Sequence, residues 1–183
     1  MSSVTFADEK HERDELRLRT ITISLSPLTS IFLFPVLHST LEININNYVS
    51  ASIVGLYGVQ RLYDSSKDYR SDEFPRRYVG IGSQSDWYYS GSFNSGKTLG
   101  AGIEYHHFEA IESTISRNRG ARVAFDFYFG FKDTKSNGFS SKLNLGVRYS
   151  KSIKRIESYS GMELTPGEDG LAFLIDIRIG ISI

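Results

Sequence analysis

Residues 91–98, GSFNSGKT, match G-x-x-x-x-G-K-[ST], the pattern in which a glycine-rich loop and a lysine hold the phosphates of a nucleotide. The run LAFLID, residues 171–176, ends in Asp176, as does the strand that presents a magnesium-binding carboxylate in such enzymes. A phosphate-binding loop must open a helix whose amide groups meet the phosphates. After Lys97, however, the sequence TLGAGIEYHHF has two early glycines and a period of two. We therefore interpret 91–98 as a hairpin turn, with Phe93 at an interface and Lys97 in water, and predict no nucleotide site.

The adjacent residues His106 and His107 are the second candidate for chemistry. In a strand, neighbouring side chains point to opposite faces, so the two imidazoles cannot ligate one metal ion together. The chain has no cysteine, which excludes a thiolate ligand or a cysteine nucleophile. Serines are available as nucleophiles, but none forms a recognisable motif with either histidine: Ser113, Ser116, Ser150 and Ser152. We predict no metal and no cofactor, and an enzymatic role stays open although the pattern favours a non-enzymatic one.

The composition indicates the structural class of the protein and excludes some functions. The chain has 183 residues, enough for one domain or one closed barrel, and its 21 basic residues balance 21 acidic ones, which argues against nucleic-acid binding. Its 12 Phe, 11 Tyr and 16 Gly with only 4 Pro are typical of β-structure. The sequence contains no run of about 18 apolar residues, so it predicts no transmembrane helix. Residues 1–20 are charged and lack the apolar region of a signal peptide, so either the protein is cytosolic or an export signal has been removed.

The dominant period is two, which predicts strands. Eight segments show it: 20–26, 36–45, 48–60, 77–89, 98–108, 121–132, 139–150 and 171–183. Short connections rich in Asn and Gly alternate with three longer polar ones, as hairpin turns alternate with loops. The connection 27–35 is apolar, and the pattern does not explain it. We predict an all-β, eight-stranded, antiparallel, up-and-down barrel over 20–183, with 1–19 as a separate N-terminal segment.

Each predicted strand has one apolar row and one polar row. A soluble barrel of the lipocalin type would turn the apolar row inward around a ligand, whereas a transmembrane barrel would turn it to lipid. The polar row is rich in glycine, which suits the narrow interior of eight strands. It also carries charges of both signs: Glu42, Glu104, Arg122, Asp126, Lys142, Arg148, Asp176 and Arg178. Because buried charges need partners, we predict a lumenal salt-bridge network that includes Asp126 with Arg148 and Glu104 with Arg122.

Aromatic residues lie near both ends of the apolar rows. Near the short turns these are Trp87, Tyr89, Phe131 and Phe139, and near the longer loops they are Tyr57, Tyr105, Tyr149 and Phe173. Two such girdles are typical of a barrel that crosses a membrane, and the predicted strands are long enough to cross when tilted. The sequence therefore favours an eight-stranded transmembrane β-barrel, with the soluble ligand-binding barrel as the alternative.

The run ISLSPL…LEININNYVSASIVGLYG, within 23–58, resembles the opening hairpin of bacterial outer-membrane β-barrel proteins. The last predicted strand resembles the C-terminal strand that the outer-membrane assembly machinery reads, although it ends in Ile183 where such proteins usually have an aromatic residue. Over 20–183 the chain resembles the small OmpA/OmpX-type barrels.

The resemblance implies an integral protein of the Gram-negative outer membrane, with 1–19 in the periplasm as a segment that could be disordered. Its implied partners are the lipid bilayer, lipopolysaccharide, the assembly machinery and a host or envelope ligand at the outward loops, with no nucleic acid. Its implied role is structural or interactive. Some such barrels acylate or deacylate lipid A with a His/Ser pair near the outer rim, so a lipid-modifying enzyme that uses His106 or His107 is the second alternative.

Overall fold

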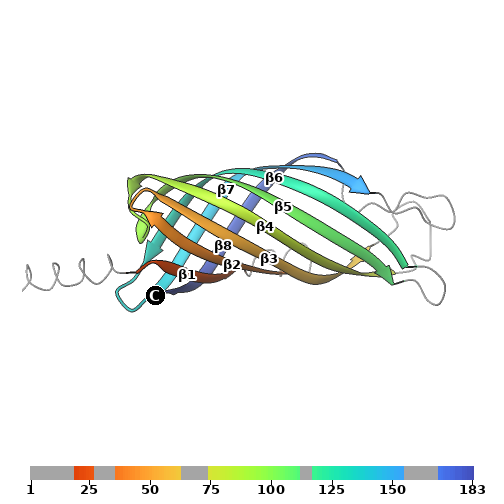
Figure 1. The fold of residues 1–183 in the computed structure, drawn as a ribbon, viewed down its shortest axis with the longest axis horizontal. Coiled ribbons are helices and arrows are strands. Elements are labelled where there is room, and N and C mark those ends of the chain that lie inside the picture. Colours follow the sequence, from red (N-terminus) through yellow and green to blue (C-terminus); the bar gives the residue numbers. More distant parts are fainter. Residues whose placement is uncertain (1–18, 27–35, 63–73, 112–116, 155–168) are drawn as a thin grey trace, which may run out of the picture.

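The computed structural model describes residues 19–26, 36–62, 74–111, 117–154 and 169–183. These residues form eight strands around one axis (Figure 1). The strands are β1 (Ile21–Ser26), β2 (Val36–Asn46), β3 (Val49–Leu62), β4 (Phe74–Gly91), β5 (Ser95–Ile111), β6 (Arg117–Thr134), β7 (Phe139–Lys154) and β8 (Gly170–Ser182). Within the described residues, no helix is long and apolar enough to cross a membrane.

The eight strands form a closed barrel in which each strand pairs with its sequence neighbours and β1 pairs with β8. Every described pairing is antiparallel. The predicted all-β, eight-stranded antiparallel barrel is confirmed. The N-terminal segment 1–18 lies outside the described residues.

Three short turns lie at one end of the barrel, which we call the short-turn end. They join β2 to β3 at 47–48, β4 to β5 at 92–94 and β6 to β7 at 135–138. The opposite end is the long-connection end, where the connections at 27–35, 63–73, 112–116 and 155–168 lie outside the described residues. The predicted hairpin at 91–98 is thus the end of β4, a three-residue turn and the start of β5.

Several strands are longer than the alternation predicts. β4 begins at Phe74 rather than at 77, and β6 begins at Arg117 rather than at 121. β5 extends to Ile111 and β7 to Lys154. The alternation marks only the part of each strand whose outward face is apolar. The backbone hydrogen bonds continue beyond that part as long as the partner strand also continues.

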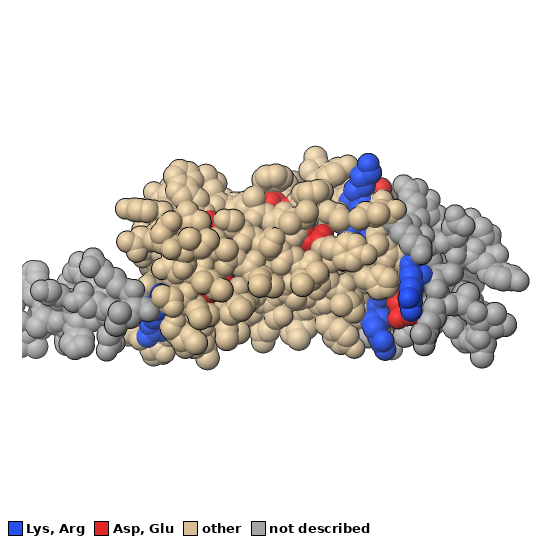
Figure 2. Space-filling view, viewed as in Figure 1, with Lys and Arg blue, Asp and Glu red and all other residues tan. Residues whose placement is uncertain are grey.

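The barrel has a polar interior and an apolar exterior. In each strand the apolar row points outward and is exposed, as for Ile81 at 62%, Phe127 at 60% and Ile175 at 58%. The other row points inward, and its charged members Asp86, Glu104 and Asp126 are fully buried. Figure 2 shows the visible wall as a largely uncharged surface with Lys and Arg at its ends. This polarity is the reverse of that in a soluble barrel with an apolar core.

Glycines make room for large side chains inside the narrow barrel. Tyr128 on β6 faces Gly100 on β5 and Gly146 on β7. A Cβ atom at Gly100 would overlap the ring of Tyr128, and one at Gly146 would overlap the carbonyl oxygen of Phe127. The glycine-rich polar row therefore follows from the close approach of neighbouring strands around Tyr128.

The seam between β1 and β8 is short. Its ladder joins Thr22–Leu25 to Ile179–Ser182, which is four residue pairs. Arg19 reinforces it, because Nη1 donates to the carbonyl oxygen of Ser182 at 2.9 Å and Nη2 donates to that of Ser136 in the β6–β7 turn. The amides of Thr20 and Ile21 both donate to the carbonyl oxygen of Ile183. Both ends of the described barrel thus meet at the short-turn end.

Candidate functional site: the polar lumen

The charged side chains and histidines of the inward rows lie in two groups along the barrel axis. The lysine cluster lies nearer the short-turn end and contains Glu42, Asp86, Lys132 and Lys142. The arginine cluster lies nearer the long-connection end and contains His38, Glu104, His106, Asp126, Arg148, Asp176 and Arg178. Opposite charges are mixed within each cluster, so both are close to neutral.

Glu42 is the centre of the lysine cluster. Its Oε2 accepts a hydrogen bond from Lys132 Nζ at 2.8 Å, and its Oε1 lies 3.4 Å from Lys142 Nζ. The hydroxyls of Ser50 and Tyr88 also donate to Oε1, at 2.7 and 2.9 Å. Charged donors and hydroxyls together satisfy a carboxylate that water cannot reach.

The two lysines of this cluster are satisfied in turn. Lys142 Nζ donates to Asp86 Oδ2 at 2.7 Å, and Lys132 Nζ donates to Thr22 Oγ1 at 3.0 Å. Lys132 has no exposed surface, which is rare for a lysine. Because each ammonium group has a carboxylate partner within the cluster, the burial of both cations is compensated.

Phe93 closes the lysine cluster at the short-turn end. It lies in the β4–β5 turn, is 1% exposed, and its ring centroid is 3.6 Å from Lys132 Nζ. Tyr88 packs edge-on against the same ring at 6.2 Å. The prediction that Phe93 contacts an outer interface was wrong, because the turn folds its aromatic residue back into the barrel over a buried cation. Lys97 is exposed, as predicted.

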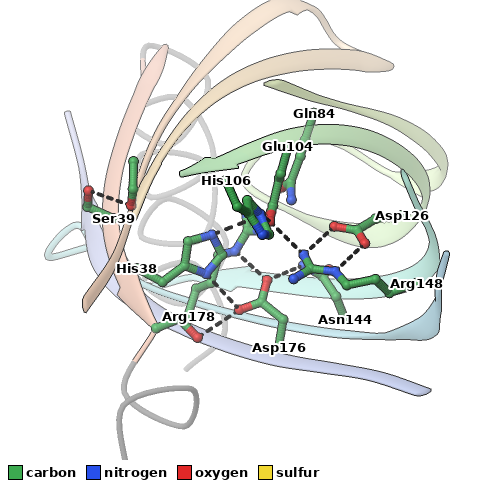
Figure 3. Close-up of polar contacts among 12 residues, drawn as sticks. His38, Ser39, Gln84, Glu104, His106, Asp126, Asn144, Arg148, Asp176 and Arg178 are labelled. Carbon is green, nitrogen blue, oxygen red and sulfur yellow. Dashed lines mark hydrogen bonds and ion pairs between the residues drawn. The ribbon is translucent and has the colours of Figure 1, made fainter. Parts of the chain in front are cut away.

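Arg148 organises the arginine cluster (Figure 3). Its Nε and Nη2 donate to the two oxygens of Asp126 at 2.6 Å each, and Nη2 also lies 2.8 Å from Glu104 Oε2. Asp126 and Arg148 face each other directly across β6 and β7, as the sequence predicted. The two-pronged contact fixes the plane of the guanidinium group as well as its position.

Glu104 has different partners from the one predicted. The sequence paired it with Arg122, whereas the structure places Arg148 and His106 on its carboxylate. Glu104 faces Ala124 in the ladder, and this small residue lets Arg148 reach over from β7. Arg122 faces His106, and its guanidinium carbon lies 5.8 Å from the Phe108 ring centroid.

Arg178 and Asp176 form the other half of the arginine cluster (Figure 3). Arg178 Nε donates to Asp176 Oδ2 at 2.6 Å, and Arg178 Nη2 donates to Gln84 Oε1 at 2.6 Å. Asn144 Nδ2 and Ser26 Oγ also donate to the Asp176 carboxylate, at 3.1 and 2.7 Å. Asp176, which a nucleotide-binding reading would place at a magnesium ion, is thus held by a guanidinium, an amide and a hydroxyl.

The two inward histidines lie in the arginine cluster. His106 Nε2 is 2.9 Å from Glu104 Oε2, and His106 Nδ1 is 2.6 Å from the hydroxyl of Tyr78. His38 lies between Asp176 and Glu104 at 3.8 and 3.9 Å, beyond hydrogen-bond reach. His107 belongs to the outward row beside Val79. The structure therefore separates His106 from His107 and places His106 between a carboxylate and a phenol.

The predicted girdle residues all lie on the outward face and are exposed: Tyr57, Trp87, Tyr89, Tyr105, Phe131, Phe139, Tyr149 and Phe173. Some are in contact with one another, as Trp87 is with Tyr89 at a centroid distance of 6.3 Å. Their register places Trp87 beside Leu99 near the short turns and Tyr57 beside Val79 near the long connections. The described wall thus has aromatic side chains toward both of its ends.

Sequence reasoning did not include several members of the lumenal network: His38, Gln84, Asp86, Lys132 and Asn144. His38, Lys132 and Asn144 lie on inward rows that carry predicted charges, whereas Gln84 and Asp86 lie on the inward row of β4, which carries none of them. Counting every second residue to the end of the predicted strand 121–132 would have found Lys132, whereas Asp86 lies on the polar row of the predicted strand 77–89 and was left out of the network. Among the described residues, no group of three or more His, Cys, Asp or Glu is arranged to hold a metal ion.

Comparison with known proteins does not add to this description. No protein-family model matches the chain, and no curated protein and no solved structure gives a significant match.

Proposed function

We propose that this protein is an integral barrel of a bacterial outer membrane, with its apolar face in lipid and a closed, charge-filled lumen. Its role is structural or interactive, through the loops at the long-connection end. The observation that carries the proposal is the inverted polarity of the barrel, because an apolar wall of this extent is stable when it faces lipid rather than water.

The height of the wall suits a bilayer. On β6, the outward residues from 121 to 131 are uncharged over ten residue steps, and the next outward residues are Arg119 and Asp133. At about 3.3 Å per residue and a tilt of about 40°, this stretch covers roughly 25 Å along the barrel axis, close to the apolar band of outer-membrane barrels. On β7, the uncharged outward stretch from Phe139 to Tyr149 has the same number of steps and ends before Lys151.

The lumen favours a structural role over a pore. The two clusters fill the interior with ion pairs, and Phe93 covers one end. A soluble, ligand-binding barrel would need an apolar interior, whereas here Glu42, Asp126 and Asp176 point inward. A lipid-modifying enzyme would need a histidine that faces a nucleophilic serine, whereas the ring nitrogens of His106 contact Glu104 and Tyr78.

The single tryptophan offers a direct test. Trp87 is the only tryptophan of the chain and lies on the outward face at 54% exposure. In vesicles of brominated phosphatidylcholine, we expect its fluorescence to be strongly quenched. A Trp87→Phe, Phe93→Trp double variant moves the indole into the lumen and should escape quenching. A chain that stays soluble and monomeric without detergent, or equal quenching of the two proteins, would contradict the proposal.

The bilayer is the first partner that this proposal implies. The outer-membrane assembly machinery, lipopolysaccharide and a host or envelope ligand at the loops are further proposed partners. Cell fractionation tests the location, since the protein should sediment with outer membranes after expression with an export signal. A band whose mobility in detergent gels changes on heating would indicate a folded barrel.

A further inference from the structure

Three cationic side chains stand on the outward face where the uncharged wall ends at the long-connection end. They are Arg77 on β4, Arg119 on β6 and Lys151 on β7, and we call them the basic rim. All three are exposed. Figure 2 shows Lys and Arg gathered at this end of the wall.

The ladder sets the spacing of the basic rim. Arg77 faces Glu109 on β5, and Glu109 faces Arg119 on β6, so the three form one row across the strands. With neighbouring strands about 4.8 Å apart, the Cα atoms of Arg77 and Arg119 are about 10 Å apart. Lys151 faces Val123 on β6 and extends the rim to β7. Val123 is four residues from Arg119 along β6, so Lys151 flanks the Arg77–Arg119 pair on the side of the wall rather than standing in the same row.

The rim keeps a cationic excess among the described outward residues. Glu109 is the acid of the row, and its Oε1 lies 3.4 Å from Arg119 Nε. The Arg119 side chain nevertheless remains 53% exposed. The carboxylate of Asp169 accepts a hydrogen bond from the backbone amide of Ser152 at 2.7 Å. Three cations therefore share the rim with these two carboxylates.

An apolar surface begins directly below each cation. On the same face, Val79 follows Arg77 and Tyr149 precedes Lys151, each two residues away. On β6, Val123 and Phe125 follow Arg119 toward the middle of the wall. Cations above an apolar wall match an amphiphile that has a negative headgroup and hydrocarbon chains.

We propose that the basic rim binds the phosphate of an anionic lipid whose acyl chains lie along β4–β7. The guanidinium groups of Arg77 and Arg119 present planar donors that suit phosphate oxygens, and Lys151 adds a point charge. This inference rests on the proposed membrane function and identifies the class of lipid that the wall prefers. Neutral lipids fill the remainder of the wall without contacting the rim.

Lipid preference can be measured with spin-labelled lipids in phosphatidylcholine vesicles. The fraction of immobilised phosphatidic acid is compared with that of phosphatidylcholine for the wild type, for R77Q/R119Q/K151Q and for K97Q/K135Q. The last variant removes two exposed lysines at the short-turn end and is the matched control. We expect the wild type and the control to favour phosphatidic acid at least about fivefold, and the triple variant to lose this preference.

The possible outcomes distinguish failure of the proposed lipid site at the basic rim from failure of the proposed membrane function. Quenching of Trp87 by brominated lipid checks insertion of every variant, and its absence in all of them would count against the membrane function itself. Normal insertion with an unchanged lipid preference in the triple variant would overturn the rim site alone. Equal loss in K97Q/K135Q would overturn it too, because the preference would then follow total charge. Competition by inorganic phosphate as effective as that of the lipid would also overturn it, since the wall would add nothing.

Discussion

Lys132 is a buried cation whose charge is compensated entirely within the lysine cluster. It is fully buried, donates to Glu42 and Thr22, and lies under the ring of Phe93. Its charge is compensated by one carboxylate that Lys142 also uses. The removal of Glu42 therefore leaves Lys132 without its carboxylate partner, which is the costly way to break an ion pair.

Glu42→Gln should destabilise the barrel by about 3–5 kcal/mol, because it leaves the two lysines with only Asp86 as a carboxylate partner in the cluster. Urea-dependent unfolding in detergent micelles measures the change. Asp133→Asn is the control, since Asp133 pairs with exposed Lys135 at 3.3 Å and should contribute less than about 1 kcal/mol. Equal effects of the two substitutions would show that the cluster is not energetically coupled.

Phe93→Ala should open the lysine cluster to solvent. We expect Lys132 to react with a water-soluble amine reagent in the variant and to be protected in the wild type. Lys97 and Lys135 are exposed in both proteins and serve as internal standards in the mass spectra. Loss of the ring also removes packing worth about 3 kcal/mol, which unfolding measures separately. Protection of Lys132 in a folded F93A variant would show that another group closes this end.

The direction of most charged lumenal side chains could be predicted from the sequence, whereas their partners could not always be. Alternation is local, so it placed Glu42, Asp126 and Asp176 on the inward rows. The choice of Arg148 over Arg122 for Glu104 depends on the register of β5, β6 and β7 and on the small size of Ala124. A one-dimensional pattern contains neither the register nor the reach of a side chain across an intervening strand.

At the scale of the strands, the apolar row defines only the middle of each one. The backbone pairing continues beyond the apolar row at the long-connection end. There β4 and β5 remain paired as far as Arg76 and Ala110. These extensions could not be predicted because apolar and polar residues no longer form two separate rows there, as in Phe74–Arg76 and Glu109–Ile111. The turn at 92–94 was predicted as a turn, but the inward direction of Phe93 depends on the cation beneath it.

Gly146→Ala should destabilise β7 more than Gly55→Ala destabilises β3. A Cβ at Gly146 meets the backbone of Phe127 on the paired strand, so the strands must separate, at a cost of about 1–3 kcal/mol. At Gly55, on the outward face, the nearest atom is the Ser39 hydroxyl at 3.2 Å, which can rotate. The unfolding midpoints of the two variants measure the difference. A larger loss for Gly55→Ala would contradict the close packing inferred around Tyr128.

On the scale of the whole molecule, the seam between β1 and β8 is the shortest of the described ladders. Seven of the eight interfaces join strands that follow each other in sequence, and only β1–β8 joins the two ends of the chain. Its four ladder pairs are supplemented by Arg19 and by the amides that bond to Ile183. The closed topology could be predicted from eight alternating segments, but the short seam could not, because alternation within β1 and β8 does not contain the register between them.

Arg19→Ala should weaken this seam selectively. Its guanidinium donates to Ser182 and Ser136, so its loss should cost about 1–2 kcal/mol. Amide hydrogen exchange should become faster in β1 and in residues 179–182, while β4–β6 keep their protection. Arg119→Ala, at the exposed rim, is the control and should leave the seam unchanged. Uniform acceleration over all strands would mean that Arg19 acts on global stability instead.

The same seam has a consequence for the order of events during folding. The hydroxyls of Thr22 and Ser182 are 2.7 Å apart although 160 positions separate the two residues in the chain. Every other pair of strands can form as a local hairpin or by the addition of a neighbour, whereas this contact must await the last strand. Until then the charged lumen and the free edge of β1 remain open, and closure is the single step that removes both at once.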